Sequence, residues 1–154
     1  MASTSEKVLS SIQVICFKIG DEEYGIDILQ VQEIQMIPQI TKLPKSSDYI
    51  MGVIDLRGKV IPIIDLSRKF GIDSSGMGST NRAIIIEIEG KEVGLAIDSV
   101  SHVIKIDTDE IEPPPPIVKG ITGKYIVGIA KIERGFVVIL DIKRIFSVEE
   151  LESL

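Results

Sequence analysis

Short apolar runs separated by turn residues recur along the 154-residue chain and predict a mainly β protein. The runs VICFKIG (14–20), AIIIEIEG (83–90) and VGLAI (93–97) are too short for typical helices. Ile and Val supply most of the apolar side chains, with 30 and 13 residues. Because β-branched side chains are stiff and pack well on a pleated surface, this composition favours sheet.

Turn residues join these runs into hairpins. Gly-Asp at 20–21 separates the first run from YGIDIL (24–29), and Gly90–Lys91 separates a similar pair later in the chain. A further hairpin is predicted at 49–66, where an Arg-Gly pair forms the turn. Pro62 in its second strand indicates a sheet edge or a bulge, because proline has no backbone N–H to donate.

The pattern occurs twice, which predicts an internal duplication. Residues 19–34 align with 88–103 at five identical positions, and 49–66 align with 125–142. Each copy has roughly sixty residues, a size at which closing the sheet into a small barrel removes exposed edges. We therefore predict two packed β-barrels; their bounds are 12–72 and 81–154, with a disordered segment at 1–11 and a Gly/Ser-rich joint at 71–80.

Short helices are predicted to close each copy. The segments LSRKFGI (66–72) and IKRIFSVEELESL (142–154) have apolar residues at i, i+3 and i+4 spacing. Asp65 and Asp141 precede them, so helix N-caps are favoured over a pair of catalytic carboxylates. The segments 27–34 and 97–104 are compatible with either a helical turn or a strand.

The charge pattern argues against nucleic-acid binding. The chain has 17 Lys and Arg against 23 Asp and Glu, a net charge of −6, and no basic run. Cys16 is the single cysteine and lies inside an apolar run, so we expect a buried thiol and no internal disulfide. Without an apolar span of 18 residues or a secretory segment, a cytoplasmic protein with no direct membrane insertion is expected.

Catalytic motifs are missing from the sequence. It has no G-x-S-x-G, P-loop or G-x-G-x-x-G pattern, and His102 is its only histidine. No second His or Cys stands near His102 at metal-ligand spacing, so we interpret it as a surface or boundary residue. The sequence therefore predicts no catalytic residue, no metal site and no cofactor.

Arg57 is the strongest candidate for a binding residue. Gly58 meets the conformational need of the turn, whereas arginine is a preferred anchor in protein contacts. In the second copy Glu133 precedes the arginine and can neutralise it, which indicates that Arg57 is the more available of the two. Glu33 aligns with His102 and either pairs with an arginine or belongs to a solvated face.

The four prolines at 113–116 predict a polyproline II segment. A stiff surface connection inside the second barrel is favoured over a ligand for a proline-reading domain. Ile117 and Val118 follow directly, and an exposed apolar pair beside a rigid loop is a candidate protein contact.

Four stretches together resemble the CheW family of bacterial chemotaxis coupling proteins, over residues 13–146. They are GDEEYGIDILQVQEI, YIMGVIDLRGKVIPIIDL, VGLAIDSVSHV and YIVGIAKIERGFVVILDI. The resemblance implies two five-stranded SH3-like barrels with short helices and a C-terminal helix, and no enzymatic activity. The sequence departs from the family at Asp55, where Asn is frequent, and in its unbroken run of four prolines.

The resemblance also implies partners and sites. The family joins the regulatory domain of the histidine kinase CheA to the cytoplasmic tips of methyl-accepting chemoreceptors, and is recruited from the cytoplasm to membrane receptor arrays. By matching motifs, Val31, Glu33, Arg57 and Gly58 fall where the family contacts the receptor. Glu112 and Ile117 fall in a loop directed toward the kinase. The alternatives are a CheW-like module in another kinase pathway and a small-ligand-binding barrel.

Overall fold

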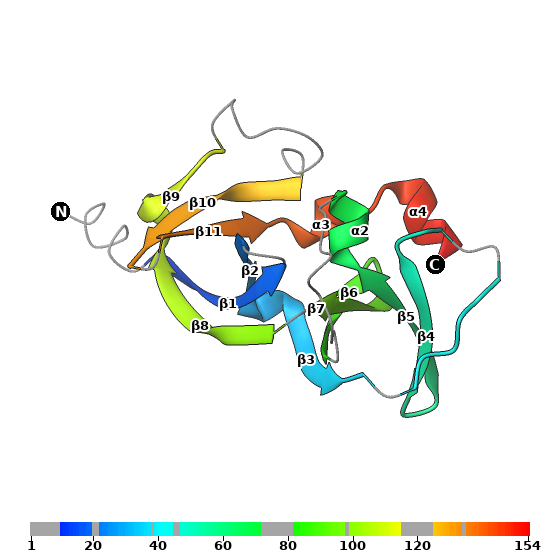
Figure 1. The fold of residues 1–154 in the computed structure, drawn as a ribbon. Coiled ribbons are helices and arrows are strands. Elements are labelled where there is room, and N and C mark those ends of the chain that lie inside the picture. Colours follow the sequence, from blue (N-terminus) through cyan, green and yellow to red (C-terminus); the bar gives the residue numbers. More distant parts are fainter. Residues whose placement is uncertain are drawn as a thin grey trace.

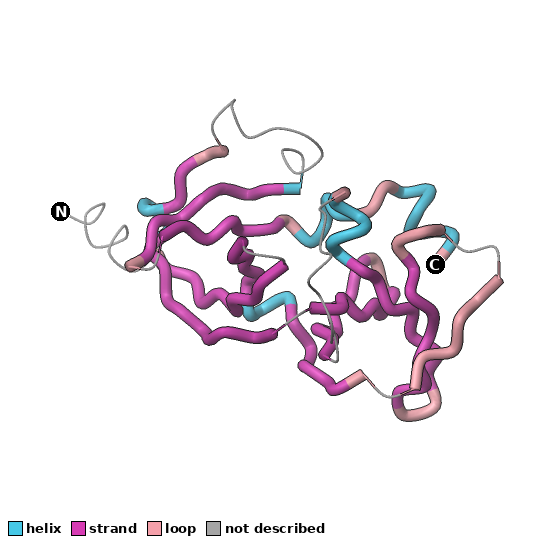
Figure 2. Tube along the Cα trace, in the orientation of Figure 1, coloured by secondary structure: helices cyan, strands magenta, loops and turns pink. Residues whose placement is uncertain are grey.

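The computed structural model describes residues 10–19, 22–37, 39–44, 47–71, 82–97, 99–114, 125–133 and 135–154. Strands dominate it, as predicted (Figures 1 and 2). The first-half strands are β1 (Ser11–Ile19), β2 (Glu22–Asp27), β3 (Val31–Met36), β4 (Ile50–Leu56) and β5 (Lys59–Asp65). The second-half strands are β6 (Arg82–Ile88), β7 (Lys91–Ile97), β8 (Ser99–Asp107), β9 (Ile111–Glu112), β10 (Ile126–Ile132) and β11 (Gly135–Leu140). Short helices are η1 (Ile28–Gln30), α2 (Leu66–Phe70), η2 (Thr108–Glu110), α3 (Ile142–Ile145) and α4 (Val148–Ser153).

The strands of the described residues form two sheets in two lobes, with α2 and α3 near their junction (Figure 1). One sheet has six strands in the order β8-β1-β2-β11-β10-β9, and the other has five in the order β3-β6-β7-β5-β4. The mainly β fold with two sheets and short helices is confirmed. The six-stranded sheet exceeds the expected five only by β9, which is two residues long.

The two halves of the chain exchange hairpins between the sheets. The β1–β2 hairpin pairs with β8 and β11 of the second half, and the β6–β7 hairpin pairs with β3 and β5 of the first half. The sheets therefore do not coincide with the predicted units at 12–72 and 81–154. The physical reason is that η1 redirects the chain after β2, so that β3 joins the opposite sheet instead of pairing with β2.

The duplication is visible in the details of both sheets. In each copy the last strand pairs in parallel with the second strand of the other copy, β5 with β7 and β11 with β2. Each copy then begins a helix at the predicted aspartate. Asp65 Oδ1 accepts from Ser67 N at 3.0 Å, and Asp141 Oδ1 accepts from Lys143 N at 3.0 Å. The predicted N-cap roles are confirmed.

The core consists of three hydrophobic clusters, because alternate side chains of a strand point to opposite faces. In β1, Val14 and Cys16 face the interior of the six-stranded sheet, whereas Ile15 and Phe17 join the cluster between the two sheets. This explains the near-continuous apolar runs and confirms the buried Cys16, which is 0% exposed. The interior of the five-stranded sheet holds Ile54, Ile61, Ile63, Ala83, Ile85 and Ala96.

Several predicted boundaries need correction. The helix expected at 142–154 is two helices, α3 and α4, because Ser147 and Glu150 form a capping box that starts a new one. β1 begins at Ser11, inside the segment expected to be disordered. Pro62 lies in β5, which is not an edge strand; its missing N–H is tolerated because pairing with β7 begins at Ile63.

Of the two segments left open from the sequence, 27–34 contains both the helical turn η1 and the first part of β3, and 97–104 contributes to β8. The joint at 72–80, the prolines at 115–116 and the pair Ile117–Val118 lie outside the described residues. Within the described part of the chain, every helix falls short of the length and apolar character needed to cross a membrane.

Candidate functional site

The turn between β4 and β5 consists of Arg57 and Gly58, and both have positive φ, at 53° and 82°. Two positive values in a two-residue hairpin turn match the type I′ geometry that fits the twist of the flanking strands. Asp55 Oδ1 accepts from Gly58 N at 2.9 Å. The expectation that Gly58 alone meets the demands of this turn is wrong, because Arg57 also adopts the left-handed conformation that few side chains favour.

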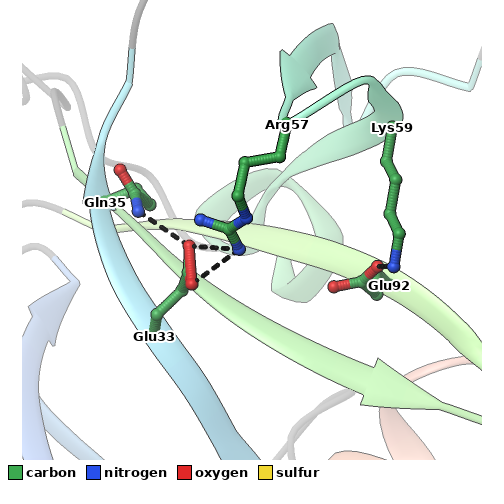
Figure 3. Close-up of polar contacts among 5 residues, drawn as sticks. All are labelled: Glu33, Gln35, Arg57, Lys59 and Glu92. Carbon is green, nitrogen blue, oxygen red and sulfur yellow. Dashed lines mark hydrogen bonds and ion pairs between the residues drawn. The ribbon is translucent and has the colours of Figure 1, made fainter.

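Arg57 forms an ion pair with Glu33 on β3. Its Nη2 donates to Glu33 Oε2 at 2.8 Å and to Oε1 at 3.1 Å. β3 and β4 are the two edge strands of the five-stranded sheet, so this pair connects opposite ends of the sheet order (Figure 3). Gln35 Nε2 also donates to Glu33 Oε1, at 2.7 Å. The sequence left open whether Glu33 pairs with an arginine or belongs to a solvated face, and in the structure it pairs with Arg57.

The electrostatics of the pair follow from these hydrogen bonds. The hydrogen bond from Arg57, followed by that from Gln35, lowers the pKa of Glu33. The hydrogen bond to Glu33 raises the pKa of Arg57 in turn. The Arg57 side chain is nevertheless 65% exposed, and only its Nη2 has an acceptor among the described residues. Its Nε and Nη1 groups therefore remain free to donate to another molecule.

Val31 lies two residues before Glu33 but on the other face of β3. The register with β6 shifts between them, so that Val31 is opposite Ile86 and Glu33 is opposite Ile85. Cross-strand partners share a face, and Val31 accordingly packs against the cluster between the sheets. The structure thus brings Glu33, Arg57 and Gly58 together and separates Val31 from them by the thickness of an edge strand.

The sequence reasoning missed the residues that complete this surface. Ile34 and Met36 on β3 are 37% and 65% exposed, and they lie opposite Ile84 and Arg82 of β6, on the face of the edge strand that also carries Val31. Lys59 Nζ contacts Glu92 Oε1 at 2.9 Å close to Arg57, so that two cations and two carboxylates gather near the turn (Figure 3). The alternation in VQEIQM was the available signal, because it places apolar residues on an edge strand. We call Glu33, Ile34, Met36, Arg57 and Gly58, which lie on both faces of the edge strand β3 and in the adjoining turn, the β3-edge surface.

Glu112 belongs to a different part of the molecule. It lies exposed in β9, the edge strand of the six-stranded sheet, opposite Ile129 of β10. Its neighbour in the prediction, Ile117, is outside the described residues. The structure therefore places Glu112 and Glu33 on different sheets.

A buried ammonium group lies where the two copies meet. The Lys69 side chain is 7% exposed, and its Nζ contacts Glu150 Oε2 at 2.7 Å. The same Nζ lies 4.7 Å from the ring centroid of Tyr49 and 5.5 Å from that of Phe146, within the range of cation–π attraction. These contacts join α2 to α4. In the aligned second copy the position of Lys69 is occupied by Ile145, so the sequence repeat gives no hint of this site.

The environment of Glu150 favours its ionised form. Burial raises the pKa of this carboxyl, but hydrogen bonds from Lys69, Ser147 N and Tyr49 outweigh burial and lower the pKa to about 2. Burial and the bond to Glu150 raise the pKa of the Tyr49 hydroxyl. The cluster contributes to the junction between helices and is largely shielded from solvent, which makes it a structural feature rather than a contact surface.

Within the described residues, no group of three or more His, Cys, Asp or Glu side chains is arranged to hold a metal ion. Among the described residues, apolar side chains gather in the interiors of both sheets. An open pocket of about 410 Å³ lies outside the β4–β5 hairpin and has one carboxylate side chain in its lining, Glu92. The small-ligand-binding alternative has no support from this arrangement.

The comparisons with known proteins agree with the two-sheet fold. A family model described as the CheW-like domain matches residues 13–150. The chain belongs to the CheW family. A chemotaxis protein CheW of Treponema pallidum is 32% identical over 146 residues, covering 92% of this chain and 86% of the relative. Another from Klebsiella aerogenes is 34% identical over 139 residues, covering 90% and 84%.

A solved structure gives the same result in three dimensions. The scaffolding protein CheW from Thermoanaerobacter tengcongensis is 40% identical, with a TM-score of 0.82 and coverage of 90% of both chains. The curated relatives are named chemotaxis proteins, and this neighbour is named a scaffold. The protein is accordingly a chemotaxis adaptor of the CheW type.

Proposed function

We propose that this chain couples the histidine kinase CheA to the cytoplasmic tips of transmembrane chemoreceptors, without catalysing a reaction of its own. The observation that carries the proposal is the exposed Arg57, held in place by Glu33 with donors to spare. Membership of a family of chemotaxis scaffolds supports the role. On this proposal the protein works in the cytoplasm and is recruited to receptor arrays at the membrane.

The receptor contact is proposed for the β3-edge surface together with Val31. Receptor tips are helical hairpins, and helices dock by laying an apolar face on a groove while charges at the rim set the register. Because β3 is an edge strand, a helix along it can reach Val31 on one face and Glu33 on the other. Arg57 then donates to a carbonyl or carboxylate of the helix through Nε and Nη1.

The kinase contact is proposed for Glu112 and Ile117. Glu112 is exposed on an edge strand of the other sheet, far in the fold from the β3-edge surface. This separation supports a coupling role, because a scaffold needs two surfaces that two partners can occupy together. The relevant partner surface is the regulatory domain of CheA.

The test is a ternary binding experiment with purified protein, a CheA regulatory domain and a receptor-tip fragment. Arg57→Asn removes the charge and introduces a residue that tolerates the left-handed backbone conformation of the turn. It is expected to weaken receptor-fragment binding at least about tenfold. Arg68→Asn is the matched control, since the Arg68 side chain is 68% exposed and also paired with a carboxylate, Asp65. Equal receptor binding by the two variants removes the assignment of Arg57.

The kinase side has its own variant. Glu112→Lys is expected to weaken binding of the CheA domain and leave receptor-fragment binding unchanged, whereas Glu110→Lys, at an exposed neighbouring position, leaves both unchanged. If wild-type protein binds a different kinase module in place of the CheA domain, the coupling function belongs to another pathway. If no ternary complex forms at all, the proposal is wrong.

A further inference from the structure

The link between β2 and β3 has the properties of a hinge. Only η1 (Ile28–Gln30) separates the two strands, and none of its residues is buried; Leu29 is 88% exposed. Asp27 before it and Val31 after it already have extended ψ values of 126°. Rotation of three residues is therefore enough to join β2 and β3 into one continuous strand.

Open space lies beside this hinge. A pocket of about 330 Å³ is bordered by η1, the start of β1 and the end of β8. The side chain of Asp27 holds the turn through one hydrogen bond, its Oδ1 accepting from Leu29 N at 3.0 Å. The 3-10 turn is held by this exposed cap, by the hydrogen bond from Val31 N to the Ile28 carbonyl oxygen, and by the packing of half-buried Ile28 against the cluster between the sheets, so straightening it breaks only these few contacts.

The hairpin before the hinge makes its sheet contacts with the second half of the chain. β1 pairs with β8 from Ser11–Asp107 to Lys18–Ser99, and β2 pairs with β11 at Tyr24–Val138 and Gly25–Ile139. A second copy of the chain presents the same strands with the same side chains. The hairpin of one molecule is therefore complementary to the sheet of another molecule without any change in sequence.

We infer that this chain forms a hairpin-exchanged dimer, in which residues 11–27 of each copy complete the six-stranded sheet of the other. The second copy is identified by the complementarity of β1–β2 to β8 and β11 of the same chain. The exchange conserves the native contacts. Its cost is the translational and rotational freedom that one molecule loses on association, so high protein concentration favours the dimer. The dimer carries two β3-edge surfaces, and its formation does not depend on which partners those surfaces bind.

Exchange between the two forms is slow. β1 is buried on both faces, so the hairpin leaves its sheet only when two hydrophobic clusters open. The dimer therefore arises when chains fold together at high concentration, and it persists after dilution. This behaviour separates it from a reversible contact between exposed surfaces.

The experiment places one cysteine on each of two chains. Gln13 and Lys105 are exposed cross-strand partners in β1 and β8, at a separation suited to a disulfide or a short crosslinker. Gln13→Cys and Lys105→Cys chains with different tags, both carrying Cys16→Ala, are refolded together at high concentration and oxidised. A crosslinked heterodimer is expected. The double variant in one chain verifies the geometry by crosslinking internally.

A pairing of Gln13→Cys with Glu152→Cys measures random collision, because Glu152 is exposed on α4 in the other lobe. Heterodimer yield at or below that level overturns the proposal. A dimer that contains both tagged chains but lacks the Gln13–Lys105 crosslink does so as well, because its contact is then between intact molecules.

The hinge has a separate variant that needs no crosslink. Asp27→Ala removes the cap of η1 and is expected to raise the dimer fraction after refolding about fivefold. Asp107→Ala is the matched control, because Asp107 precedes η2 but makes no side-chain cap bond. Size-exclusion chromatography after refolding measures both variants. Equal dimer fractions in the two variants overturn the role of η1 as the hinge.

Discussion

Arg57, in the β4–β5 turn, forms an ion pair with Glu33 on β3. β3 and β4 are the two edge strands of the five-stranded sheet, so the ion pair connects its two edges. The pair is 24 positions apart in the sequence and unites the β4–β5 turn with β3. Surface ion pairs of this exposure contribute little to stability. The consequence for this protein is positional, because Glu33 and Gln35 together fix where the Arg57 guanidinium presents its remaining donors.

Exchanging the two charges separates the structural from the binding role of this pair. In Glu33→Arg/Arg57→Glu the ion pair re-forms in the reverse sense, so thermal unfolding is expected to match wild type closely. Receptor-fragment binding remains at least about tenfold weaker, because the partner then meets a carboxylate at the turn. Full recovery of binding in the double variant shows that only the internal pair matters and contradicts a direct contact by Arg57.

Removing the partner of the buried Lys69 is expected to destabilise the fold. Glu150→Ala leaves an ammonium group that is 7% exposed without its carboxylate, and we expect a loss of about 2–4 kcal/mol in the free energy of unfolding. Glu152→Ala, exposed on the same helix, is expected to change it by at most about 0.5 kcal/mol. Urea denaturation measures both variants. If both variants lose a similar free energy of unfolding, the Lys69–Glu150 pair has no stabilising role.

The same carboxylate predicts a pH dependence. The pKa of Glu150 is about 2 in the folded protein against 4.5 ordinarily, so the unfolded chain takes up the proton first as the pH falls. The stabilisation by Glu150 is thus complete above about pH 4.5 and disappears progressively toward pH 2. In denaturant titrations the stability difference between wild type and Glu150→Gln is expected to shrink across this window. A constant difference contradicts the assignment.

Gly128 is required for the approach of β9 to β10. A Cβ atom there lies 2.6 Å from the carbonyl oxygen of Glu112 and 2.5 Å from Ile111 Cγ2. Gly128→Ala is expected to cost about 1–3 kcal/mol and to speed amide exchange in β9. Gly90→Ala is the comparison, since it has open space and only a left-handed φ of 81° to strain. Protection of β9 that stays at the wild-type level counts against this explanation.

The parts of this fold that depend on short-range chemistry were predictable. Short apolar runs bounded by turn residues, together with the β-branched composition, predicted the strands, and Asp65 and Asp141 predicted the helix starts. The alignment of the two copies gave the duplication, because each copy carries its own turn and cap residues. Arg57 was recognisable as unusual, since the turn did not need an arginine's charge.

The sequence by itself determined which segments become strands and which residues form turns and caps. Only the tertiary structure decided that the copies exchange hairpins and that a bulge puts Val31 and Glu33 on opposite faces of β3. The contact between Lys69 and Glu150, which are 81 positions apart in the sequence, was also decided only there. The physical reason is that a strand's edge carries the same backbone donors and acceptors in both copies. Local sequence therefore leaves the choice of pairing partner open, and burial of the central cluster between the sheets settles it.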